Sequence, residues 1–259
     1  MPLYVDLNSD SGESFGRWRL GKEEELFNYI TSASIACGFH AGDPVVMRRT
    51  VRLAKEKGVA IGAHPGFPDL MGFGRRAMEV SAEELENYVL YQIGALYSIA
   101  RAEGIELQHV KPHGAMYNMA WVRRDYAEAI VKAIKSFDPN LILVAPYGSE
   151  MHRVAEEHGI AVAFEAFADR NYRSDGRLVP RSHPEALVKS VEEAVERAVR
   201  MVSEGKVRTI DGKEIEIKVH TICIHGDSPH AVEMAKKLRE RFEEVGIRVA
   251  PLREFVRRA

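Results

Sequence analysis

The stretch Ile35-Ala-Cys-Gly-Phe-His-Ala-Gly-Asp43 begins as a short apolar run and ends in a polar cluster. Pro44 follows at once, and proline is favoured at the first position of a helix. The pattern predicts a strand, a loop and a helix in direct succession. The same order recurs, each time followed by a helical pattern, in six further stretches: Val5–Glu13, Ile61–Pro65, Val110–Gly114, Leu143–Tyr147, Phe164–Arg170 and Ile222–Asp227.

Seven strand–helix units predict an α/β protein whose parallel sheet is covered by helices, because crossovers between parallel strands are right-handed. We interpret them as a seven-stranded, imperfectly closed (β/α) barrel rather than an open doubly wound sheet. Strands are expected near 3–8, 33–37, 59–64, 108–112, 141–145, 161–166 and 218–225, and helices near 22–31, 44–57, 81–103, 124–136, 148–158, 184–204 and 229–245. The units run almost to the end without a linker, so we expect one domain over residues 1–259.

Capping residues mark several of the helix boundaries. Asp43 is suited to cap the helix that Pro44 begins, and Gly58 is suited to end it. Two capping boxes, each a serine followed three residues later by a glutamate, predict further helix starts: Ser81 with Glu84, and Ser182 with Glu185.

Two segments depart from the strand–helix rhythm. Residues 207–217 alternate in polarity around Asp211-Gly212, which is typical of a β-hairpin with a type I′ turn. We expect this hairpin to be inserted before the last strand. Residues 65–76 are rich in glycine, proline and phenylalanine, and we expect them to form a long loop over the pocket.

Composition limits the classes of partner. The formal net charge is −2 and the charges are interspersed, so the sequence favours neither nucleic acid nor a membrane surface as a partner. An apolar run of about 18 residues, which a membrane-spanning helix needs, is lacking. The chain enters a strand without a signal peptide, and it has only Cys37 and Cys223, so we expect a cytoplasmic protein.

The polar clusters should meet, because the active site of a β/α barrel lies where the carboxyl ends of its strands open. In the first cluster, Asp6, Asn8 and Asp10 alternate and should share the inward side of one strand, and Glu13 follows them. Two carboxylates close together push their pKa values apart, which provides an acid and a base near neutral pH. Asp10 and Glu13 are therefore candidate catalytic groups.

The second to fourth clusters add histidines and a lysine. His40 and His64 are candidate catalytic residues, whereas Asp43 could both cap its helix and help to seat a substrate carboxylate. Lys111 and His113 share one side of their strand, and a lysine among apolar neighbours is costly unless it is paired. Lys111 could hold a carboxylate, polarise a carbonyl or form a Schiff base. Tyr117 and Asn118 follow in a loop and could add hydrogen bonds to a substrate.

The remaining clusters supply Glu165, Arg170, His225 and Asp227, which we predict to bind substrate. Arg170 could instead pair with Asp169 and only order the loop. The sequence leaves open whether a metal is bound. A site of His40, His64, His113 and His225 with Asp10 is conceivable, but no motif with metal-ligand spacing specifies it. A nucleotide-binding motif, either a phosphate loop or GxGxxG after a strand, is also lacking.

Taken together, these motifs resemble the LamB/YcsF family of 5-oxoprolinase A subunits. The matching segments keep their order along nearly the whole chain: Asp6–Glu13, Ile35–Asp43, Gly62–Asp69, Val110–Gly114 with Tyr117-Asn118, Phe167–Arg170, Leu178–Arg181 and His225–Asp227. The resemblance implies a barrel of the glycoside hydrolase/deacetylase type. It also implies ATP-dependent opening of 5-oxo-L-proline to L-glutamate, with release of ADP and phosphate, together with partner subunits B and C. ATP would be the co-substrate and could bring a divalent cation.

Two other functions remain open at this point. One is a metal-dependent deacetylase or amidohydrolase that acts on a sugar or an acylated amine without ATP. The other is a non-catalytic module that binds a small molecule. The convergence of many titratable groups favours an enzyme. We predict catalytic roles for Asp10, Glu13, His40, His64, Lys111 and His113, and substrate binding by Asn8, Asp43, Tyr117, Asn118, Glu165, Arg170, His225 and Asp227.

Overall fold

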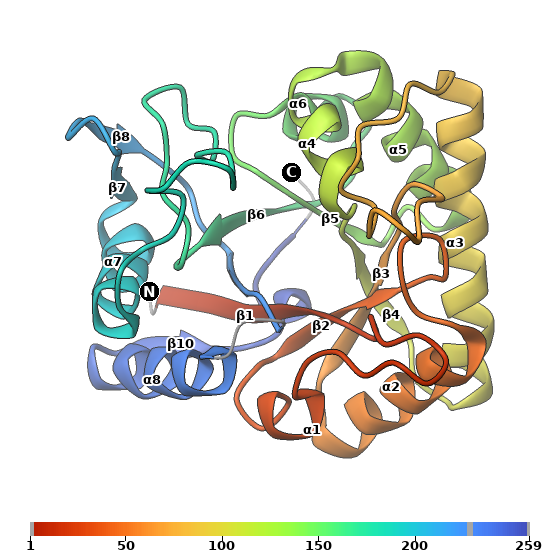
Figure 1. Cartoon of the computed structure of the whole chain (residues 1–259), viewed down its shortest axis with the longest axis horizontal. Helices are drawn as coiled ribbons and strands as arrows, with labels where there is room; N and C mark the ends of the chain where they lie inside the picture. The colour runs from red at the N-terminus through yellow and green to blue at the C-terminus, as the bar shows by residue number, and fades with distance from the viewer. Residues whose placement is uncertain (1–2, 227–229, 258–259) are drawn as a thin grey trace.

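A computed structural model describes residues 3–226 and 230–257. Its centre is a closed barrel of seven parallel strands in the order β1-β2-β3-β4-β5-β6-β9, and pairing between β1 and β9 closes the ring (Figure 1). The expected seven-stranded (β/α) barrel is therefore confirmed. The barrel strands are β1 (Leu3–Ser11), β2 (Ser32–Ala36), β3 (Ala60–His64), β4 (Leu107–Val110), β5 (Ile142–Ala145), β6 (Val162–Phe167) and β9 (Thr221–Ile224).

Helices surround this barrel on the outside (Figure 1). They are α1 (Glu23–Leu26), α2 (Pro44–Lys57), α3 (Ala82–Ala102), α4 (Gly114–Val122), α5 (Arg124–Phe137), α6 (Glu150–Glu157), α7 (Val191–Glu204) and α8 (Ala231–Glu244), with a short 3-10 helix η1 (Leu252–Glu254). Within the described part of the chain, the search for a helix long and apolar enough to cross a membrane finds none.

Strand β1 pairs with two different strands along the same edge. Its first residues, Leu3 to Val5, pair with the short strand β10 (Ile247–Val249), whereas Asp6 to Ser9 pair with β9. The sequence analysis did not anticipate β10. Three residues carry too little pattern to be recognised, and this strand exists because the barrel leaves the start of β1 without another partner.

Several of the helix caps predicted from the sequence are confirmed. The Asp43 side chain accepts hydrogen bonds from the backbone N–H groups of Val45 and Val46, and Gly58 ends α2 in the left-handed conformation. The capping box of Ser81 and Glu84 is present at the start of α3.

The second predicted capping box is wrong. Helix α7 begins at Val191, and Ser190 caps it by accepting from the backbone N–H of Glu193. The segment around Ser182 and Glu185 lies in the loop between β6 and α7 instead. The backbone there is engaged elsewhere, because Asn171 N donates to Ala186 O and Val188 N donates to Asp169 O.

Three other local expectations need correction. Helix α1 is only four residues long, and Tyr117 and Asn118 lie in the unpredicted helix α4 rather than in a loop. The β-hairpin is confirmed as β7 (Lys206–Arg208) with β8 (Glu214–Glu216), but its turn is not type I′. Five residues separate the two strands, and Gly212 has a positive φ whereas Asp211 does not.

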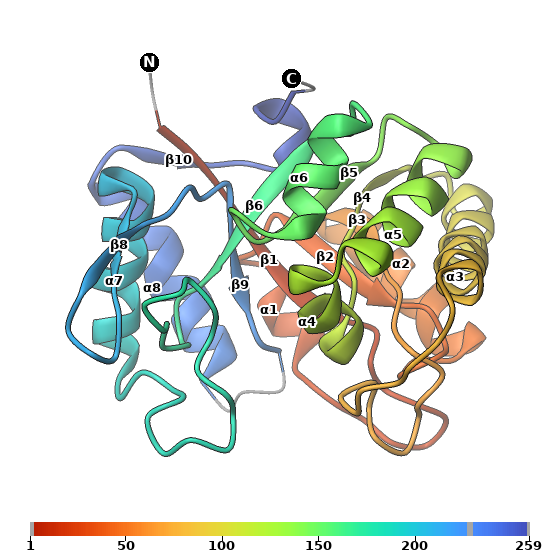
Figure 2. The same cartoon turned by 90° about the horizontal axis from the view of Figure 1, so that it is seen from above.

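The two sides of the barrel wall differ in chemistry. Alternate residues of β1 such as Val5 and Leu7 face outward and join the main hydrophobic core beneath the helices. The inward side is polar, because the buried Asp6 carboxylate accepts hydrogen bonds from Ser32 (2.6 Å) and Thr221 (2.5 Å). This polar interior leads directly to the open end of the barrel. Figure 2 shows the long loops after β3 and β6 on that end, opposite the side where β1 begins.

Candidate active site

A cavity of about 530 Å³ lies at the carboxyl ends of the strands. Strand ends supply Asp10, His64, Lys111, Glu165 and His225, and helix α4 supplies Tyr117. Residues that are far apart in the sequence thus meet at one place, as barrel topology requires. The structure brings most of the residues selected from the sequence to this cavity: Asp10, His64, Lys111, His113, Tyr117, Asn118, Glu165, Arg170 and His225 all line it.

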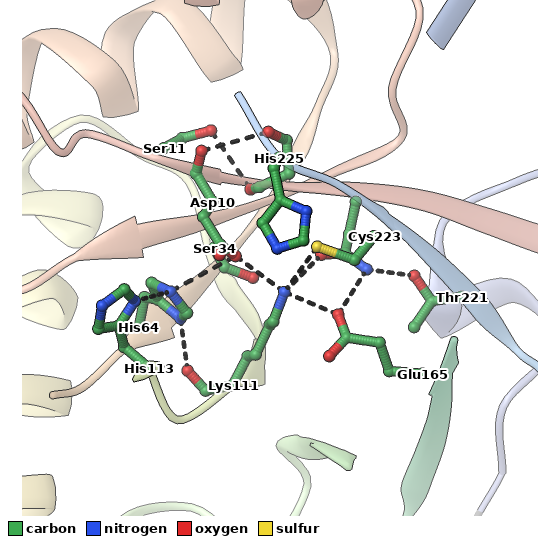
Figure 3. A network of polar contacts seen from close by, with 12 residues as sticks. Asp10, Ser11, Ser34, His64, Lys111, His113, Glu165, Thr221, Cys223 and His225 are labelled. Carbon is green, nitrogen blue, oxygen red and sulfur yellow. Dashed lines mark hydrogen bonds and ion pairs between the residues drawn. The ribbon is translucent and has the colours of Figure 1, made fainter. Parts of the chain in front are cut away.

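Lys111 is the centre of the site (Figure 3). Its backbone N–H donates to Ala63 O at 2.9 Å, so the chain continues the alignment of β4 with β3 and the side chain points into the barrel. Its ammonium lies 2.8 Å from Asp10 Oδ1 and 2.7 Å from Glu165 Oε1. It also lies within hydrogen-bond distance of Asn8 Oδ1 (3.1 Å) and Cys223 Sγ (3.2 Å).

The charges in this network support one another. Burial alone would lower the pKa of Lys111, but the carboxylates of Asp10 and Glu165 raise it well above its usual value. Burial would likewise raise the pKa of Asp10, yet His64 and Lys111 lower it well below its usual value. Lys111 is therefore a cation and Asp10 an anion at neutral pH. Because Lys111 is a charged amine with four close neighbours, the geometry does not favour a Schiff-base role.

Hydrogen bonds orient the two histidines beside this network. His64 Nδ1 lies 2.7 Å from the carbonyl oxygen of Lys111, and His113 Nε2 lies 2.8 Å from the carbonyl oxygen of Phe73. A carbonyl can only accept, so each of these nitrogens carries a proton. The other two nitrogens, His64 Nε2 and His113 Nδ1, then face each other at 2.9 Å.

This arrangement favours the uptake of one proton by the pair. Two neutral rings would oppose two lone pairs at 2.9 Å, whereas a proton on His64 Nε2 makes a hydrogen bond to His113 Nδ1. Burial lowers the pKa of His113 to about 3, so its ring is neutral and its Nδ1 is an acceptor for His64 Nε2. Asp10 Oδ1 lies 3.4 Å from the same His64 nitrogen. The pair is suited to take a proton from water and return it.

His40 and Glu13 complete the histidine side of the site. His40 Nε2 lies 3.2 Å from Glu13 Oε1, and its ring stacks on His113 with centroids 3.7 Å apart. Burial, and then the neighbouring His113, lower the pKa of His40 well below its usual value. His40 supports His113 from behind and is not among the residues that line the cavity.

Four of these side chains could hold a metal ion. Among the described residues, Glu13, His40, His64 and His113 each offer an atom within 4.8 Å of the others. The set predicted from the sequence differs, because His225 lies instead with Asp10 and Cys223. A metal ligated by imidazole lies near the plane of each ring. The planes of His40 and His113 are stacked and nearly parallel, at 4°, so these rings would have to turn apart to share an ion.

Two further buried polar atoms lie close to each other in the site: the second carboxylate oxygen of Glu165, Oε2, and the hydroxyl of Tyr117. The phenol is the donor and the Glu165 carboxylate is the acceptor of this contact. Burial and the Glu165 carboxylate raise the pKa of Tyr117 well above its usual value, so the phenol keeps its proton. Buried polar atoms are rarely left without a partner, and here each satisfies the other. Both residues line the cavity, so a bound substrate would meet this pair.

Three further residues were predicted to bind substrate: Asn8, Asp43 and Asp227. Asn8 lies deeper in the barrel, where its amide donates to Glu165 and to Thr221. Asp43 is occupied by its helix cap and by Gly16 N–H at 2.7 Å, and it does not line the cavity. Asp227 lies outside the described residues, so its predicted role stays a prediction.

Sequence reasoning missed several residues of the cavity wall. Trp121 extends it from α4, and the mouth carries Arg75, Arg173 and Arg177, besides Arg181 of the matching segment Leu178–Arg181. The signal that could have found Arg173 and Arg177 is the concentration of arginine in the glycine-containing loop that follows β6. In addition, Cys223, for which no role was predicted from the sequence, is buried and contacts Lys111.

Comparison with known proteins shows the family. The LamB/YcsF family model matches residues 5–257. The chain belongs to the LamB/YcsF family. It is 58% identical to the 5-oxoprolinase A subunit of Pyrococcus abyssi, over 98% of this chain and 100% of that protein. It is 52% identical to the 5-oxoprolinase A subunit of Bacillus subtilis, over 96% and 97% of the two chains.

Solved structures agree with the fold. The lactam utilization protein from Thermus thermophilus superposes with a TM-score of 0.91 at 50% sequence identity, over 96% of this chain and 99% of that one. A family 4 carbohydrate esterase from Streptomyces lividans superposes with a TM-score of 0.53 at 12% identity, over 99% of this chain and 97% of that one. The second similarity extends to the fold alone, which is of the deacetylase type.

Proposed function

We propose that this LamB/YcsF family member is the A subunit of an ATP-dependent 5-oxoprolinase. It would open 5-oxo-L-proline to L-glutamate with ATP as co-substrate, a divalent cation accompanying the nucleotide, and subunits B and C as partners. The high identity to proteins named as the A subunit of 5-oxoprolinase supports this proposal. The observation that carries it in the structure is the Lys111 network beside the His64–His113 pair, in a cavity with room for a small lactam.

The chemistry explains why ATP would be consumed. A five-membered lactam is a stable amide, and transfer of a phosphoryl group from ATP to its oxygen gives an imidate phosphate and ADP. Water then adds to the same carbon, and cleavage of the carbon–nitrogen bond releases the amine and leaves an acyl phosphate. A second water cleaves the acyl phosphate to glutamate and inorganic phosphate. Two waters and one ATP balance one glutamate, one ADP and one phosphate.

Residues of this chain would serve the two water steps. His64 Nε2 takes the proton of the attacking water and returns it to the departing ring nitrogen, which is general acid–base catalysis. His113 and Asp10 hold the protonated form of His64. Tyr117, which is held by Glu165, lines the cavity in which the lactam would bind. Lys111 keeps Asp10 and Glu165 ionised and in position.

The test is glutamate release from 5-oxo-L-proline, measured for the chain alone and with subunits B and C, each with and without ATP. We expect release only in the complete mixture with ATP, and only weak binding of ATP by the isolated chain, whose sequence has no nucleotide-binding motif. Efficient ATP-dependent turnover by the chain alone would contradict the division of labour. Release of acetate from an acetylated sugar without ATP, abolished by a chelator, would support the deacetylase function instead.

A further inference from the structure

The mouth of the cavity has an excess of positive charge that the proposed proton chemistry does not use. Five arginines line it: Arg75 from the loop after β3, and Arg170, Arg173, Arg177 and Arg181 from the loop after β6. With Lys111 they make six cations. Among the described residues that line the cavity, the carboxylates are Asp10 and Glu165, and both are held by Lys111. The cavity wall therefore carries more cations than acids.

Arg170 is the buried member of this group. The residue is only 6% exposed, and its Nη2 donates to Val179 O at 2.7 Å. Its Nε is buried and has no hydrogen-bond partner in the protein. The neighbouring Asp169 directs Oδ2 to His225 at 2.9 Å. Burial, and then the charge of Arg181, lower the pKa of Arg170 to about 10, so it remains charged at neutral pH but in an unfavourable setting.

The loop that carries these arginines is ordered by its own hydrogen bonds. Arg170 pairs with Leu187, and Tyr172 pairs with Leu178, as isolated antiparallel bridges. Tyr172 is buried and its hydroxyl accepts from Phe167 N at 3.0 Å, which ties the loop to the end of β6. A structured loop with a buried, incompletely paired guanidinium is a preorganised anion site. Arg170 is already desolvated when the protein folds, so binding of an anion does not have to supply the free energy of its desolvation.

The amount of charge indicates the kind of anion. The carboxylate of a lactam substrate carries one negative charge and needs one guanidinium. Asp175 already partners Arg173 (3.5 Å) and Arg177 (2.9 Å), so Arg170 and Arg181 are the cavity-lining cations of this loop without an ion pair to a described carboxylate. The charge of the buried Asp169 acts on both, but its Oδ2 is directed to His225. Planar guanidinium groups match the tetrahedral oxygens of a phosphoryl group in pairs.

We propose that Arg170 and Arg181 form a subsite for the phosphoryl dianion of the activated lactam. This inference rests on the proposed function. In the reaction written above, the phosphoryl group stays on the substrate through the first water step. The adduct of water can then lose the amine, which leads to glutamate, or lose phosphate, which returns the lactam and wastes ATP. Loss of the amine requires a proton on the ring nitrogen, and Arg170 and Arg181 hold the adduct by its phosphoryl oxygens so that this nitrogen meets its proton donor. The subsite thereby favours the first path and couples ATP cleavage to ring opening.

Binding is tested on the isolated chain by calorimetric titration with inorganic phosphate, acetyl phosphate, acetate and ATP. The variants are Arg170→Gln and Arg181→Gln, and the matched control is Arg101→Gln, an exposed arginine of α3 that lines a cavity among residues at the opposite strand ends. We expect phosphate and acetyl phosphate to bind the native chain more tightly than acetate, and both site variants to lose at least tenfold. Unchanged phosphate affinity in both site variants would overturn the subsite. Tighter binding of ATP than of acetyl phosphate would overturn its assignment to the activated lactam.

Coupling is tested with subunits B and C present, from the ratio of ADP to glutamate formed. The native mixture should give a ratio near one. Arg181→Gln, an exposed position whose change leaves the core intact, should raise this ratio at least twofold. A slower reaction with an unchanged ratio would overturn the coupling role. If the native mixture releases no glutamate, the proposed function fails, whereas the phosphate titration of the isolated chain still decides whether the anion subsite exists.

Discussion

At the scale of single residues, the site depends on a buried lysine, Lys111, that has more hydrogen-bond acceptors around its ammonium group than it has N–H donors. The ammonium of Lys111 has three N–H groups, and four acceptors lie within 3.2 Å of it: Asn8, Asp10, Glu165 and Cys223. Such a group serves best as a fixed charge that positions carboxylates. Its neighbours, rather than Lys111 itself, are left to meet the substrate.

Replacement of Lys111 should therefore affect both activity and stability. We expect Lys111→Met to reduce turnover by about 100-fold or more, the scale of a lost electrostatic group. It should also reduce the free energy of unfolding by about 3–5 kcal/mol, because two buried carboxylates lose their cation. The measurements are glutamate release in the reconstituted complex and urea unfolding at pH 7. Native stability in the variant would show that the network is not a buried ion pair.

His113 provides the matched variant in which activity and stability should separate. His113→Gln keeps a donor for the Phe73 carbonyl but removes the nitrogen that accepts from His64. Turnover should fall by about 100-fold, the scale of a lost acid–base partner. The free energy of unfolding should change by less than about 1 kcal/mol, since the hydrogen bond to Phe73 is retained. A wild-type rate would remove the His64–His113 pair from the mechanism.

At the scale of elements, Asp43 connects a helix start to a loop of the barrel mouth. Its Oδ1 caps α2, and its Oδ2 accepts from Gly16 N–H at 2.7 Å. Hydrogen bonds from Val46 and Gly16 lower the pKa of Asp43, which keeps it ionised for both tasks. The sequence suggested substrate binding as a second role, but the geometry favours the structural one.

Asp43→Ala should consequently destabilise the protein by about 1–2 kcal/mol, the usual cost of a lost N-cap. The KM for 5-oxo-L-proline should stay within about twofold, the difference expected when no substrate contact is lost. Ser81→Ala is the control, because Ser81 caps α3 with the same chemistry. A tenfold rise in KM for Asp43→Ala, with no such change for Ser81→Ala, would show that Asp43 does contribute to substrate binding.

At the scale of the whole molecule, the barrel encloses a buried histidine, His109, that is neutral in the folded protein. His109 contacts Ser34 Oγ at 3.1 Å and Gln108 Nε2 at 3.3 Å inside the barrel. Its ring also packs over Gly62, where an added Cβ would lie 2.3 Å from it. Burial lowers the pKa of His109 from 6.5 to about 3. The unfolded chain therefore binds more protons than the folded one between these two pH values.

The sign of the pH dependence follows. The pKa of His109 is lower in the folded state, so this residue costs stability as the pH falls from about 6.5 towards 3. His109→Gln should lessen the loss of unfolding free energy between pH 7 and pH 4 by on the order of 2–4 kcal/mol. Urea unfolding at several pH values measures this, with His183→Gln in an exposed loop as control. Equal pH dependence in the native protein and His109→Gln would mean that His109 is not a source of acid sensitivity.

The sequence alone was sufficient for features that depend on neighbouring residues. Strand ends followed by polar clusters gave the seven units, and the N-cap Asp43 and the box of Ser81 with Glu84 marked helix starts correctly. The inward alternation of Asp6, Asn8 and Asp10 followed from the two-residue period of a strand. These signals are local, because a hydrogen bond within one turn or the side of a pleat is set within a few residues.

Only the tertiary structure decided the features that depend on distant partners. The loop that contains Ser182 and Glu185, the strand β10 and the contact between His64 and His113 each depend on a group far away in the sequence. The same is true of Lys111, whose four acceptors come from β1, β6 and β9. Barrel closure brings these strands together, and burial then makes the free energy of each polar atom depend on the partner it meets there.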